Sequence, residues 1–567
     1  MQIRKYKWKK KEVDQTISLQ LAKELNVSKV ISEILVARGI HNFDSAQNYF
    51  RPNETQFQDG FLMKGMHLSV ERLNKAISNN QNVLVYGDYD VDGTCSVAMM
   101  VRFLKHLKAK VLYYQPHRET EGYGISLKSV EWSKENKIDL VIALDCGIKD
   151  FLAAEAYKNE NIDLIICDHH NPSEKIPNAF SILNPKQNDC TYPFKELCGC
   201  GVGFKLIHAL GHNQGESLKD FLPYLDLVAT AIGADIVPIV GENRILAYHG
   251  VRVMNASPRP GFQALIKNIK KTTLTIADVV FVIAPRINAA GRMKHGNYAV
   301  SLLKESNITQ AELVAQEIES FNTTRRALDQ NITKEALAQI EELNETECSS
   351  TVVYDSSWNK GVIGIVASRL IETYYRPTLV FTKSGDLLTA SARSVRGFDV
   401  YEALQNCSKY IEQFGGHKYA AGLSIKEQNF RAFKQAFENE VDKTLAVHLR
   451  TPELLIDAEI QLSAVTPKFY RILKQFAPFG PQNMAPVFMT SDVVDTGYAK
   501  CVGEDDKHLK ISVAQHNGEP INGIGFGLGD KLPYVANKST FSIAYAIDEN
   551  QWNGRISLQL KLKDIKQ

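Results

Sequence analysis

Three short apolar runs in the first half of the chain each end in side chains that can bind metal ions. Asp88, Asp90 and Asp92 follow residues 83–86, Asp145 follows residues 140–144, and Asp168, His169 and His170 follow residues 164–167. The runs are continuously apolar, which is typical of strands buried on both faces of a parallel sheet. Because ligands bind beyond the carboxyl ends of such strands, we expect these side chains to converge on one edge. Converging carboxylates need cations, so the pattern predicts a metal-dependent enzyme.

Asp235 is a further candidate, because it ends an apolar helical stretch, residues 227–234, just before Pro238. The expected metal ligands are Asp90, Asp92, Asp145, His169 and Asp235, with Asp88, Asp168 and His170 close by. Oxygen-rich sites with one or two imidazoles suit Mn²⁺ or Mg²⁺. Two such ions about 4 Å apart support in-line phosphoryl displacement, so phosphoester hydrolysis is the expected reaction. A lone Asp-x-Asp-Gly is usually a solvated turn and a lone His-His pair usually structural, but three such groups at strand ends argue against coincidence.

Three segments combine arginine with glycine or hydroxyl side chains, as phosphate-binding segments do. They are residues 116–118 with 122–124, residues 286–292 and residues 391–394. Each segment alone is a weak indication. Gly415-Gly416-His417 has two readings that remain open, a loop that brings backbone and imidazole to a ligand or a tight turn with a surface histidine.

Composition sets few limits on function. The 567 residues correspond to roughly four domains, and the net charge of +2 neither requires nor excludes nucleic acid. The nine cysteines lie mostly in apolar runs, which fits a reducing cytoplasm. Cys198-Gly199-Cys200 lacks the spacing of a zinc knuckle, so we expect it to be structural filler.

The chain shows no signal of membrane insertion. Residues 1–11 are rich in Lys and Arg, but no apolar core of a signal peptide follows, and no run is long enough to span a bilayer. We expect a cytoplasmic protein without a membrane contact. The basic N-terminal arm could touch DNA, but a disordered, solvated tail is the favoured interpretation.

The elements that must position these residues are of mixed type. Strands alternate with helices up to about residue 300, which predicts a parallel sheet in an α/β fold. Helical spacing without Pro or Gly predicts one long helix over residues 309–343, and a second α/β lobe follows. In the C-terminal part, Phe541, Ile543 and Tyr545 alternate with polar residues, as do residues 556–562, and Asn553-Gly554 supplies a hairpin turn, which predicts a small β-barrel or sandwich.

Several motifs together resemble the RecJ single-strand-specific exonucleases of the DHH phosphoesterase superfamily. The motifs are residues 87–93, 145–148, 168–170, 234–238, 286–293, 361–367, 391–394 and 415–417, together with 38–40 and 478–480. The resemblance covers nearly the whole chain. One departure is that Trp358 is followed by Asn359 where many relatives carry His, so no functional imidazole is placed there.

The resemblance implies the following domains: an N-terminal helical cap at 1–60, a DHH catalytic domain at 61–305, a connecting helix at 306–345, a DHH-associated domain at 346–450 and an OB-fold nucleic-acid-binding domain at 451–567. It implies that Asp90, Asp92, Asp145, His169 and Asp235 hold two Mn²⁺ or Mg²⁺ ions, with Asp145 as a bridge. Asp88 and His170 resemble accessory catalytic residues that orient ligands or meet the scissile phosphate. The residues that resemble phosphate contacts are Arg118, Arg286, Arg292, Ser391, Arg393 and His417, and the choice between Arg286 and Arg292 stays open.

The implied activity is 5′-to-3′ degradation of single-stranded DNA with a free 5′ end to mononucleotides, in recombination and repair. The expected partners are single-strand-binding protein and a RecQ-type helicase, and we expect a monomer. One alternative is a DHH enzyme for short oligonucleotides, cyclic dinucleotides or pyrophosphate, against which the extra β-rich domain argues. Another is a non-catalytic single-strand-binding scaffold, against which the complete set of acids argues.

Overall fold

The chain folds into two compact units. The computed structural model describes residues 6–567, except residues 268, 270, 272, 517, 538 and 553 and the side chain of residue 552. Unit 1 contains the N-terminal residues up to Ala46, Thr324–Gln475 and Pro486–Gln567, and unit 2 contains Gln47–Thr323 and Phe476–Ala485. The domain boundaries given above remain predictions. Within the described residues, no helix has both the length and the apolar character needed to cross a membrane.

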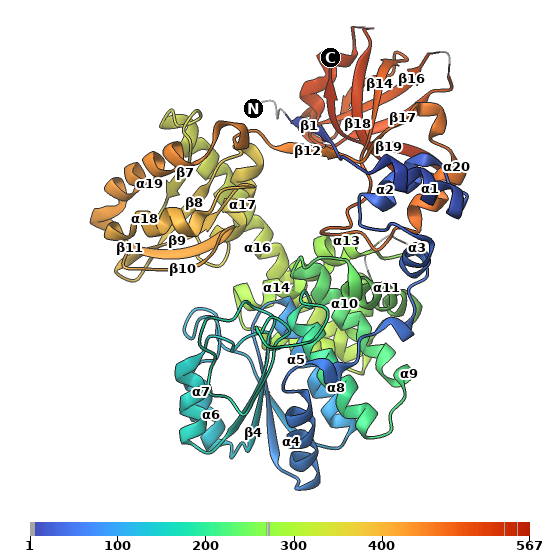
Figure 1. The fold of residues 1–567 in the computed structure, drawn as a ribbon. Coiled ribbons are helices and arrows are strands. Elements are labelled where there is room, and N and C mark those ends of the chain that lie inside the picture. The colour runs from blue at the N-terminus through green and yellow to red at the C-terminus, as the bar shows by residue number, and fades with distance from the viewer. Residues whose placement is uncertain are drawn as a thin grey trace. The chain divides into compact units, whose positions relative to one another are not determined.

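Unit 2 is built on a five-stranded parallel sheet, of which β4 is labelled in Figure 1. The strand order is β3-β2-β4-β5-β6. The strands are β2 (Asn82–Gly87), β3 (Lys110–Tyr114), β4 (Leu140–Leu144), β5 (Asp163–Cys167) and β6 (Ser181–Leu183). The three predicted apolar runs are β2, β4 and β5, and β4 is buried along its whole length. The prediction of buried parallel strands is therefore confirmed.

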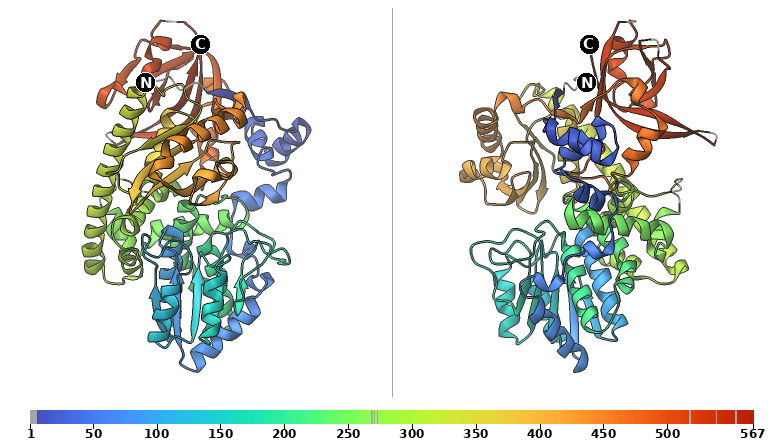
Figure 2. Two further views of the ribbon diagram at one scale, coloured as in Figure 1. Left: turned by 90° about the vertical axis from the view of Figure 1, so that its left-hand side faces the viewer. Right: turned by 45° about the vertical axis from the view of Figure 1, so that its right-hand side comes forward.

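Helices cover both faces of this sheet (Figure 2). The helices of unit 2 are α4 (Met66–Ser78), α5 (Val91–His106), α6 (Leu127–Glu135), α7 (Phe151–Asn159), α8 (Gly199–Asn213), α9 (Leu218–Phe221), α10 (Leu225–Ala234), α11 (Gly241–Ala256), α12 (Pro260–Ile266), α13 (Ile276–Asp278), α14 (Ala284–Met293) and α15 (Asn297–Lys304). Because strand side chains alternate between faces, Leu84 and Val141 pack with α6 and α7, whereas Val85 and Ile142 pack with α4, α5 and α8. Both faces of the sheet are thus apolar, and the polar side chains lie at the ends of the strands.

The predicted long helix is α16 (Ile308–Glu342), which agrees with the expected range of 309–343 to one residue at each end. Its sequence runs from unit 2 into unit 1. In unit 1 the buried Asp329 of α16 accepts hydrogen bonds from Nε and Nη2 of Arg369 at 2.6 and 2.7 Å. This bidentate pair fixes the C-terminal half of α16 to the helix that carries Arg369.

Unit 1 contains the predicted second α/β lobe, a mixed sheet with the order β10-β11-β9-β8-β7. Its elements are β7 (Thr351–Tyr354), α17 (Ile363–Thr373), β8 (Thr378–Ser384), β9 (Leu387–Arg393), α18 (Val400–Asn406), β10 (Gln413–His417), β11 (Ala420–Lys426) and α19 (Phe430–Thr444). The expected loop or turn at Gly415-Gly416-His417 is wrong, because these residues belong to the edge strand β10 and pair with β11. Glycine is unfavourable inside a strand, so a glycine pair in the sequence is more typical of a turn. Here both glycines lie in an edge strand because they pair with β11.

The C-terminal part of unit 1 is a β-barrel. Its elements are β12 (Glu453–Ile456), β13 (Ala458–Glu459), α20 (Pro467–Lys474), β14 (Phe488–Asp495), β15 (Lys500–Val502), β16 (His508–Gln515), β17 (Ile521–Gly525), α21 (Leu532–Val535), β18 (Phe541–Trp552) and β19 (Arg555–Lys566). The sheet order β14-β18-β19-β17-β16 closes on itself through a β14–β16 pairing. The strands β18 and β19 form the predicted hairpin, although Asn553 of its expected turn lies outside the described residues. Phe541, Ile543 and Tyr545 are buried as the alternation predicts, whereas Ile556 is exposed.

The N-terminal region joins unit 1 through a strand. Its elements are β1 (Lys7–Lys10), α1 (Gln15–Leu25), α2 (Lys29–Val36) and α3 (Phe43–Phe50), whose last residues enter unit 2. β1 pairs in parallel with β12, and the indole N–H of Trp8 donates to Asp564 at 2.8 Å. The expected solvated tail is therefore wrong for residues 7–10, and residues 1–5 lie outside the described part of the chain.

Candidate metal centre

The register of the parallel sheet brings the candidate residues together. Gly87, Leu144 and Cys167 are neighbours across β2, β4 and β5. The next residue after each of them is an aspartate, so Asp88, Asp145 and Asp168 leave the sheet at the same edge. Asp235 arrives from elsewhere as the residue that ends α10. The predicted convergence on one edge of the sheet is thus found in the structure.

Three overlapping groups of side chains have ligand atoms close enough to share an ion. The groups are Asp88, Asp90 and Asp145; Asp92, His169 and Asp235; and Asp145, His169 and His170, each with its ligand atoms within 4.8 Å of one another. His169 Nε2 lies 3.2 Å from Asp145 Oδ1, 3.6 Å from Asp235 Oδ2 and 4.0 Å from Asp92 Oδ2. Asp145 belongs to two of the groups, which fits its expected role as a bridge.

The electrostatics of this cluster are those of a site that requires cations. Burial, followed by the neighbouring carboxylates, raises the pKa values of Asp88, Asp92 and Asp145 well above the ordinary range. Burial and Asp90 raise the pKa of Asp235 to about 7. Burial also lowers the pKa of His169 to about 3, so its imidazole is neutral and can act as a ligand.

Several buried atoms of the cluster make no hydrogen bond within the described part of the chain. Oδ1 of Asp88, Oδ1 of Asp145 and both ring nitrogens of His169 lack hydrogen-bond partners among the described residues. A buried polar atom without a partner costs about 1–3 kcal/mol, so several of them in one place indicate a binding site for a cation. Carboxylate oxygens with one imidazole are a donor set for hard or borderline divalent ions. The residues present therefore fit the expected ions.

A helix N-terminus holds one of the candidate ligands. The N–H groups of Gly199 and Cys200 donate to the two oxygens of Asp92 at 2.7 and 2.6 Å. These are the first residues of α8, where N–H groups have no partner inside the helix. A Cβ on Gly199 would lie 2.5 Å from Asp145 Oδ1, so only glycine fits. The Cys-Gly-Cys segment, expected to be filler, therefore supports the site through its backbone.

Asp168 organises the histidine pair instead of joining the ligand groups. It accepts hydrogen bonds from the N–H of His169 at 2.7 Å and from Nδ1 of His170 at 2.7 Å. Burial alone would raise the pKa of Asp168. The hydrogen bond from His170 and the positive charge of His170 instead lower the pKa of Asp168 to about 2. The same bond outweighs burial and raises the pKa of His170. Tyr123, which the sequence analysis placed only in a weak phosphate-binding segment, has its hydroxyl 3.2 Å from the His170 ring nitrogens.

Gln115 is another residue that the sequence did not reveal. It follows β3, and its buried amide donates to the carbonyl of Asp88 at 2.8 Å and to the hydroxyl of Thr94 at 3.0 Å. These bonds fix the loop that carries Asp88 and Asp90. The available signal was its position, since it comes directly after a strand whose carboxyl end lies on the same edge as those of β2 and β4.

Three of the four arginines expected near phosphate lie in unit 2, and they differ in their surroundings. The Arg118 guanidinium lies 4.9 Å from the ring centroid of Tyr89. Tyr89 belongs to the acidic loop, residues 88–90. Arg286 and Arg292 both lie in α14, a helix and not a loop. Arg286 already donates to the carboxylate of Glu319 at 2.6 and 3.2 Å and to the carbonyl of Val282 at 2.8 Å. The choice between Arg286 and Arg292 as the phosphate contact stays open.

The remaining expected phosphate contacts form a cluster within unit 1. Ser391 and Arg393 lie on β9, and His417 ends β10. His417 pairs with Ala420 of β11, which in turn pairs with Arg393, so the two side chains share one end of the sheet. Nη1 of Arg393 donates to the hydroxyl of Ser391 at 3.0 Å. The structure thus places His417 of β10 at the same end of the sheet as Ser391 and Arg393 of β9.

Comparison with known proteins identifies the family. Residues 82–232 match the DHH family, N-terminal domain; residues 347–443 match the DHHA1 domain; and residues 456–564 match the RecJ OB domain. The chain is 34% identical to a single-stranded-DNA-specific exonuclease RecJ of Bacillus subtilis (strain 168), over 99% of this chain and 71% of the relative. The chain belongs to the RecJ family. It is also 32% identical to the RecJ of Escherichia coli (strain K12), over 98% of each protein.

A solved RecJ structure has the same fold. A crystal structure of RecJ in complex with Mn²⁺ from Thermus thermophilus superposes with a TM-score of 0.86 at 26% identity. The match covers 99% of this chain and 80% of that RecJ chain. The expected architecture of a DHH domain, a long helix, a DHH-associated domain and an OB-fold is therefore confirmed.

Proposed function

We propose that this protein is a single-stranded-DNA-specific exonuclease that hydrolyses phosphodiester bonds with two divalent ions. The reaction would run in the 5′-to-3′ direction and release mononucleotides, as part of DNA recombination and repair. Membership of the RecJ family supports the activity and the substrate. The Mn²⁺ in the Thermus thermophilus RecJ supports Mn²⁺ or Mg²⁺ as the cofactor.

The observation that carries this proposal is the set of overlapping Asp and His groups around Asp145 and His169. We assign one ion to Asp88, Asp90 and Asp145, and a second ion to Asp92, Asp145, His169 and Asp235. In this assignment Asp88 is a ligand as well as an accessory residue, because its Oδ1 is buried without a partner among the described side chains. When bound, the two ions would neutralise the scissile phosphate and the leaving oxygen and would lower the pKa of an attacking water.

The chain's own residues prepare the site for this chemistry. Asp92 is fixed by the N-terminus of α8, and the loop of Asp88 is fixed by Gln115. His170 is held by Asp168 with a raised pKa and is 43% exposed, so its protonated imidazole can meet a phosphate oxygen from the solvent side. We assign to His170 the role of stabilising negative charge on the phosphate or on the leaving oxygen.

The polar cluster of unit 1 supports action at a chain end. Arg393 and His417 share one end of a sheet with Ser391, which gives cationic and hydroxyl donors suited to a phosphate monoester. We propose that this cluster holds the terminal 5′ phosphate. A cluster that binds a terminal phosphate would favour substrates with a free 5′ end.

The barrel of unit 1 provides a surface suited to single strands. Phe526 is 60% exposed, with the ring of His508 at a centroid distance of 5.2 Å and Lys561 Nζ at 5.9 Å. Exposed aromatic rings next to lysines stack bases and attract the backbone without reading sequence. We propose that this surface binds the strand away from the cleaved end.

The cellular context follows from the resemblance alone. We propose a cytoplasmic monomer that receives single strands from a RecQ-type helicase and meets single-strand-binding protein on its substrate. Pull-down of these two proteins with the purified chain would test this part independently of the nuclease activity.

The activity is tested with 5′-end-labelled single-stranded DNA, duplex DNA and a dinucleotide, each with Mn²⁺ and with chelator. We expect labelled mononucleotide from the single strand in Mn²⁺ only. Asp145→Ala should abolish hydrolysis and keep DNA binding in chelator, whereas Glu131→Ala, an exposed acid on α6, should leave the activity unchanged. Preferred turnover of the dinucleotide, or full activity of Asp145→Ala, would refute the proposal.

A further inference from the structure

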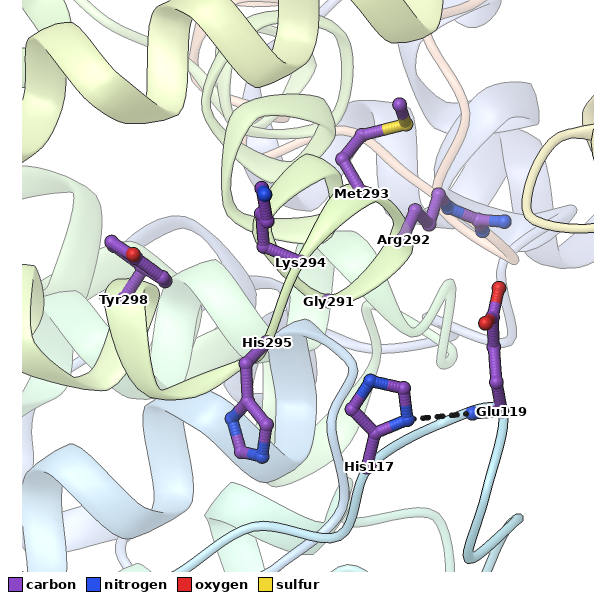
Figure 3. A pocket seen from close by; sticks show the side chains of 8 residues that line it. All are labelled: His117, Glu119, Gly291, Arg292, Met293, Lys294, His295 and Tyr298. Carbon is purple, nitrogen blue, oxygen red and sulfur yellow. Dashed lines mark hydrogen bonds between the residues drawn. The ribbon is translucent and has the colours of Figure 1, made fainter.

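A pocket of about 360 Å³ in unit 2 is not explained by the metal centre. Its lining comes from the loop after β3 and from the junction of α14 and α15: His117, Glu119, Gly291, Arg292, Met293, Lys294, His295 and Tyr298 (Figure 3). The pocket adjoins the acidic loop, because a Cβ on Gly291 would lie 2.9 Å from the carbonyl oxygen of Tyr89, the residue between Asp88 and Asp90. It therefore lies beside the place where phosphoester chemistry is expected.

The lining has a strong excess of groups that attract anions. Arg292 and Lys294 carry permanent positive charge, and His117 and His295 add two imidazoles. Glu119 is the one acid among the eight lining residues, and its side chain is exposed to solvent. An open pocket with this composition favours an anionic ligand over a neutral one.

The two imidazoles are oriented as hydrogen-bond donors. Nδ1 of His117 accepts the N–H of Glu119 at 3.3 Å, and Nδ1 of His295 accepts the N–H of Asn297 at 3.2 Å. Since Nδ1 is an acceptor in both rings, the proton of each neutral ring is on Nε2. The ring centroids lie 5.8 Å apart, and Figure 3 shows the rings beside one another on the floor of the pocket. Burial and the neighbouring His117 lower the pKa of His295, which keeps this ring a neutral donor.

An aromatic ring also lines the pocket. Tyr298 is 37% exposed, and its ring packs edge-to-face on Phe321 of α16 at a centroid distance of 5.4 Å. A ring supported from behind and open in front can stack against a nucleobase. Cationic groups and an aromatic ring in one pocket match the phosphate and the base of a nucleotide.

We propose that this pocket binds the phosphate group of a nucleotide through Arg292, Lys294 and the Nε2–H donors of His117 and His295. Tyr298 would face the base. Arg292 resembles a phosphate contact of relatives, and His117 lies in the predicted phosphate-binding segment 116–118. Lys294, His295 and Tyr298 are new assignments. The identity of the nucleotide rests on the proposed function: it is either a released mononucleotide or a nucleotide of the bound strand, and both present the same phosphate chemistry.

The test is a site-resolved footprint on the full chain in chelator, where hydrolysis does not interfere. Acetic anhydride acetylates accessible lysines, and mass spectrometry follows Lys294 and Lys158, an exposed lysine of α7 on the far face of the sheet. Probes are deoxythymidine 5′-monophosphate and a short deoxythymidine oligonucleotide. We expect several-fold slower acetylation of Lys294 with at least one probe and no change at Lys158. Protection by the mononucleotide indicates a product site, and protection by the oligonucleotide alone indicates a strand site.

A binding measurement provides an independent check. Lys294→Ala, at an exposed position, should weaken calorimetric binding of the protecting probe about tenfold, and Lys158→Ala should leave it unchanged. Equal acetylation of Lys294 with and without both probes, or equal protection of both lysines, would overturn the inference. Hydrolysis of single-stranded DNA by the same preparation in Mn²⁺ is measured separately, so protection without hydrolysis contradicts the proposed function and leaves the pocket assignment standing.

Discussion

Gly199 donates its backbone N–H to Oδ2 of Asp92 at 2.7 Å, and the Cβ that Gly199 lacks would lie 2.5 Å from Oδ1 of Asp145. One residue thus holds one candidate ligand through its N–H and makes room for another through its missing side chain. The positive end of the α8 dipole also favours a carboxylate at this position. The position of α8 therefore determines where two of the acidic side chains lie.

Gly199→Ala should damage the metal centre more than the fold. The added methyl group must displace Asp145 or α8, so we expect a loss of about 1–3 kcal/mol in the free energy of unfolding. A displacement near 1 Å at the centre should lower kcat/KM on the order of 100-fold. Gly201→Ala is the matched control, because its Cβ would meet Leu197 at 3.4 Å, an ordinary contact. Equal activity of the two variants in Mn²⁺ would contradict the arrangement.

Asp168→Asn should lower the pKa of His170. The hydrogen bond and charge of Asp168 hold that pKa above its ordinary value, and an amide removes the charge. The stabilisation by this pair is present below the unfolded pKa of histidine and is lost as pH rises through the folded pKa. We expect the variant to lose about 2 kcal/mol of stability at mildly acidic pH. NMR titration of ¹³C-labelled histidines, with His170→Gln for assignment, measures the shift, and an unchanged pKa would show that Asp168 does not control it.

The metal-free protein should become less stable as pH rises from about 4 to about 7. Burial and Asp90 raise the folded pKa of Asp235 to about 7, so the folded state binds more protons than the unfolded state across this window. Mn²⁺ replaces these protons, so saturating Mn²⁺ should remove the decline. Denaturant unfolding in chelator and in Mn²⁺ at several pH values tests both statements. Asp235→Asn should flatten the slope in chelator, and a stability that increases across the window in chelator would contradict the charge assignment.

Replacing Ile236 with glycine should increase the stability of the protein. Its φ of 60° is left-handed, where a β-branched side chain costs about 1–2 kcal/mol, and its side chain is 65% exposed. Glycine loses about 0.5–1 kcal/mol through its flexible unfolded state, so Ile236→Gly should gain up to about 1 kcal/mol. Because Ile236 follows Asp235, the freed backbone should also weaken Mn²⁺ binding. Loss of stability with unchanged Mn²⁺ binding would show that the strain does not position Asp235.

The sequence predicted the parts of the site that depend on local pattern. Residues at the ends of β2, β4 and β5 could be placed because continuous apolar runs identify buried strands, and parallel strands share one carboxyl edge. Asp235 could be placed at the end of an apolar helix for a similar reason. The long helix followed from apolar spacing without Pro or Gly, and the barrel followed from alternation in β18 and β19.

The features that the sequence did not predict depend on contacts between segments that are distant in the chain. The donors to Asp92 are backbone N–H groups of Gly199 and Cys200, which have no side-chain signature. Lys7–Lys10 forms a strand only because β12, more than 400 residues later, offers an edge. Gly415 and Gly416 resemble a turn in isolation, and pairing with β11 makes them a strand. In each case a tertiary partner overrides the local preference.

The most direct test of the central claim is a crystal grown with Mn²⁺ and measured for anomalous scattering. We predict two manganese peaks about 4 Å apart, with Asp145 touching both and Asp88, Asp90, Asp92, His169 and Asp235 completing the coordination. Side chains of this group far apart with no peak between them, or peaks confined to acids elsewhere on the chain, would contradict the account.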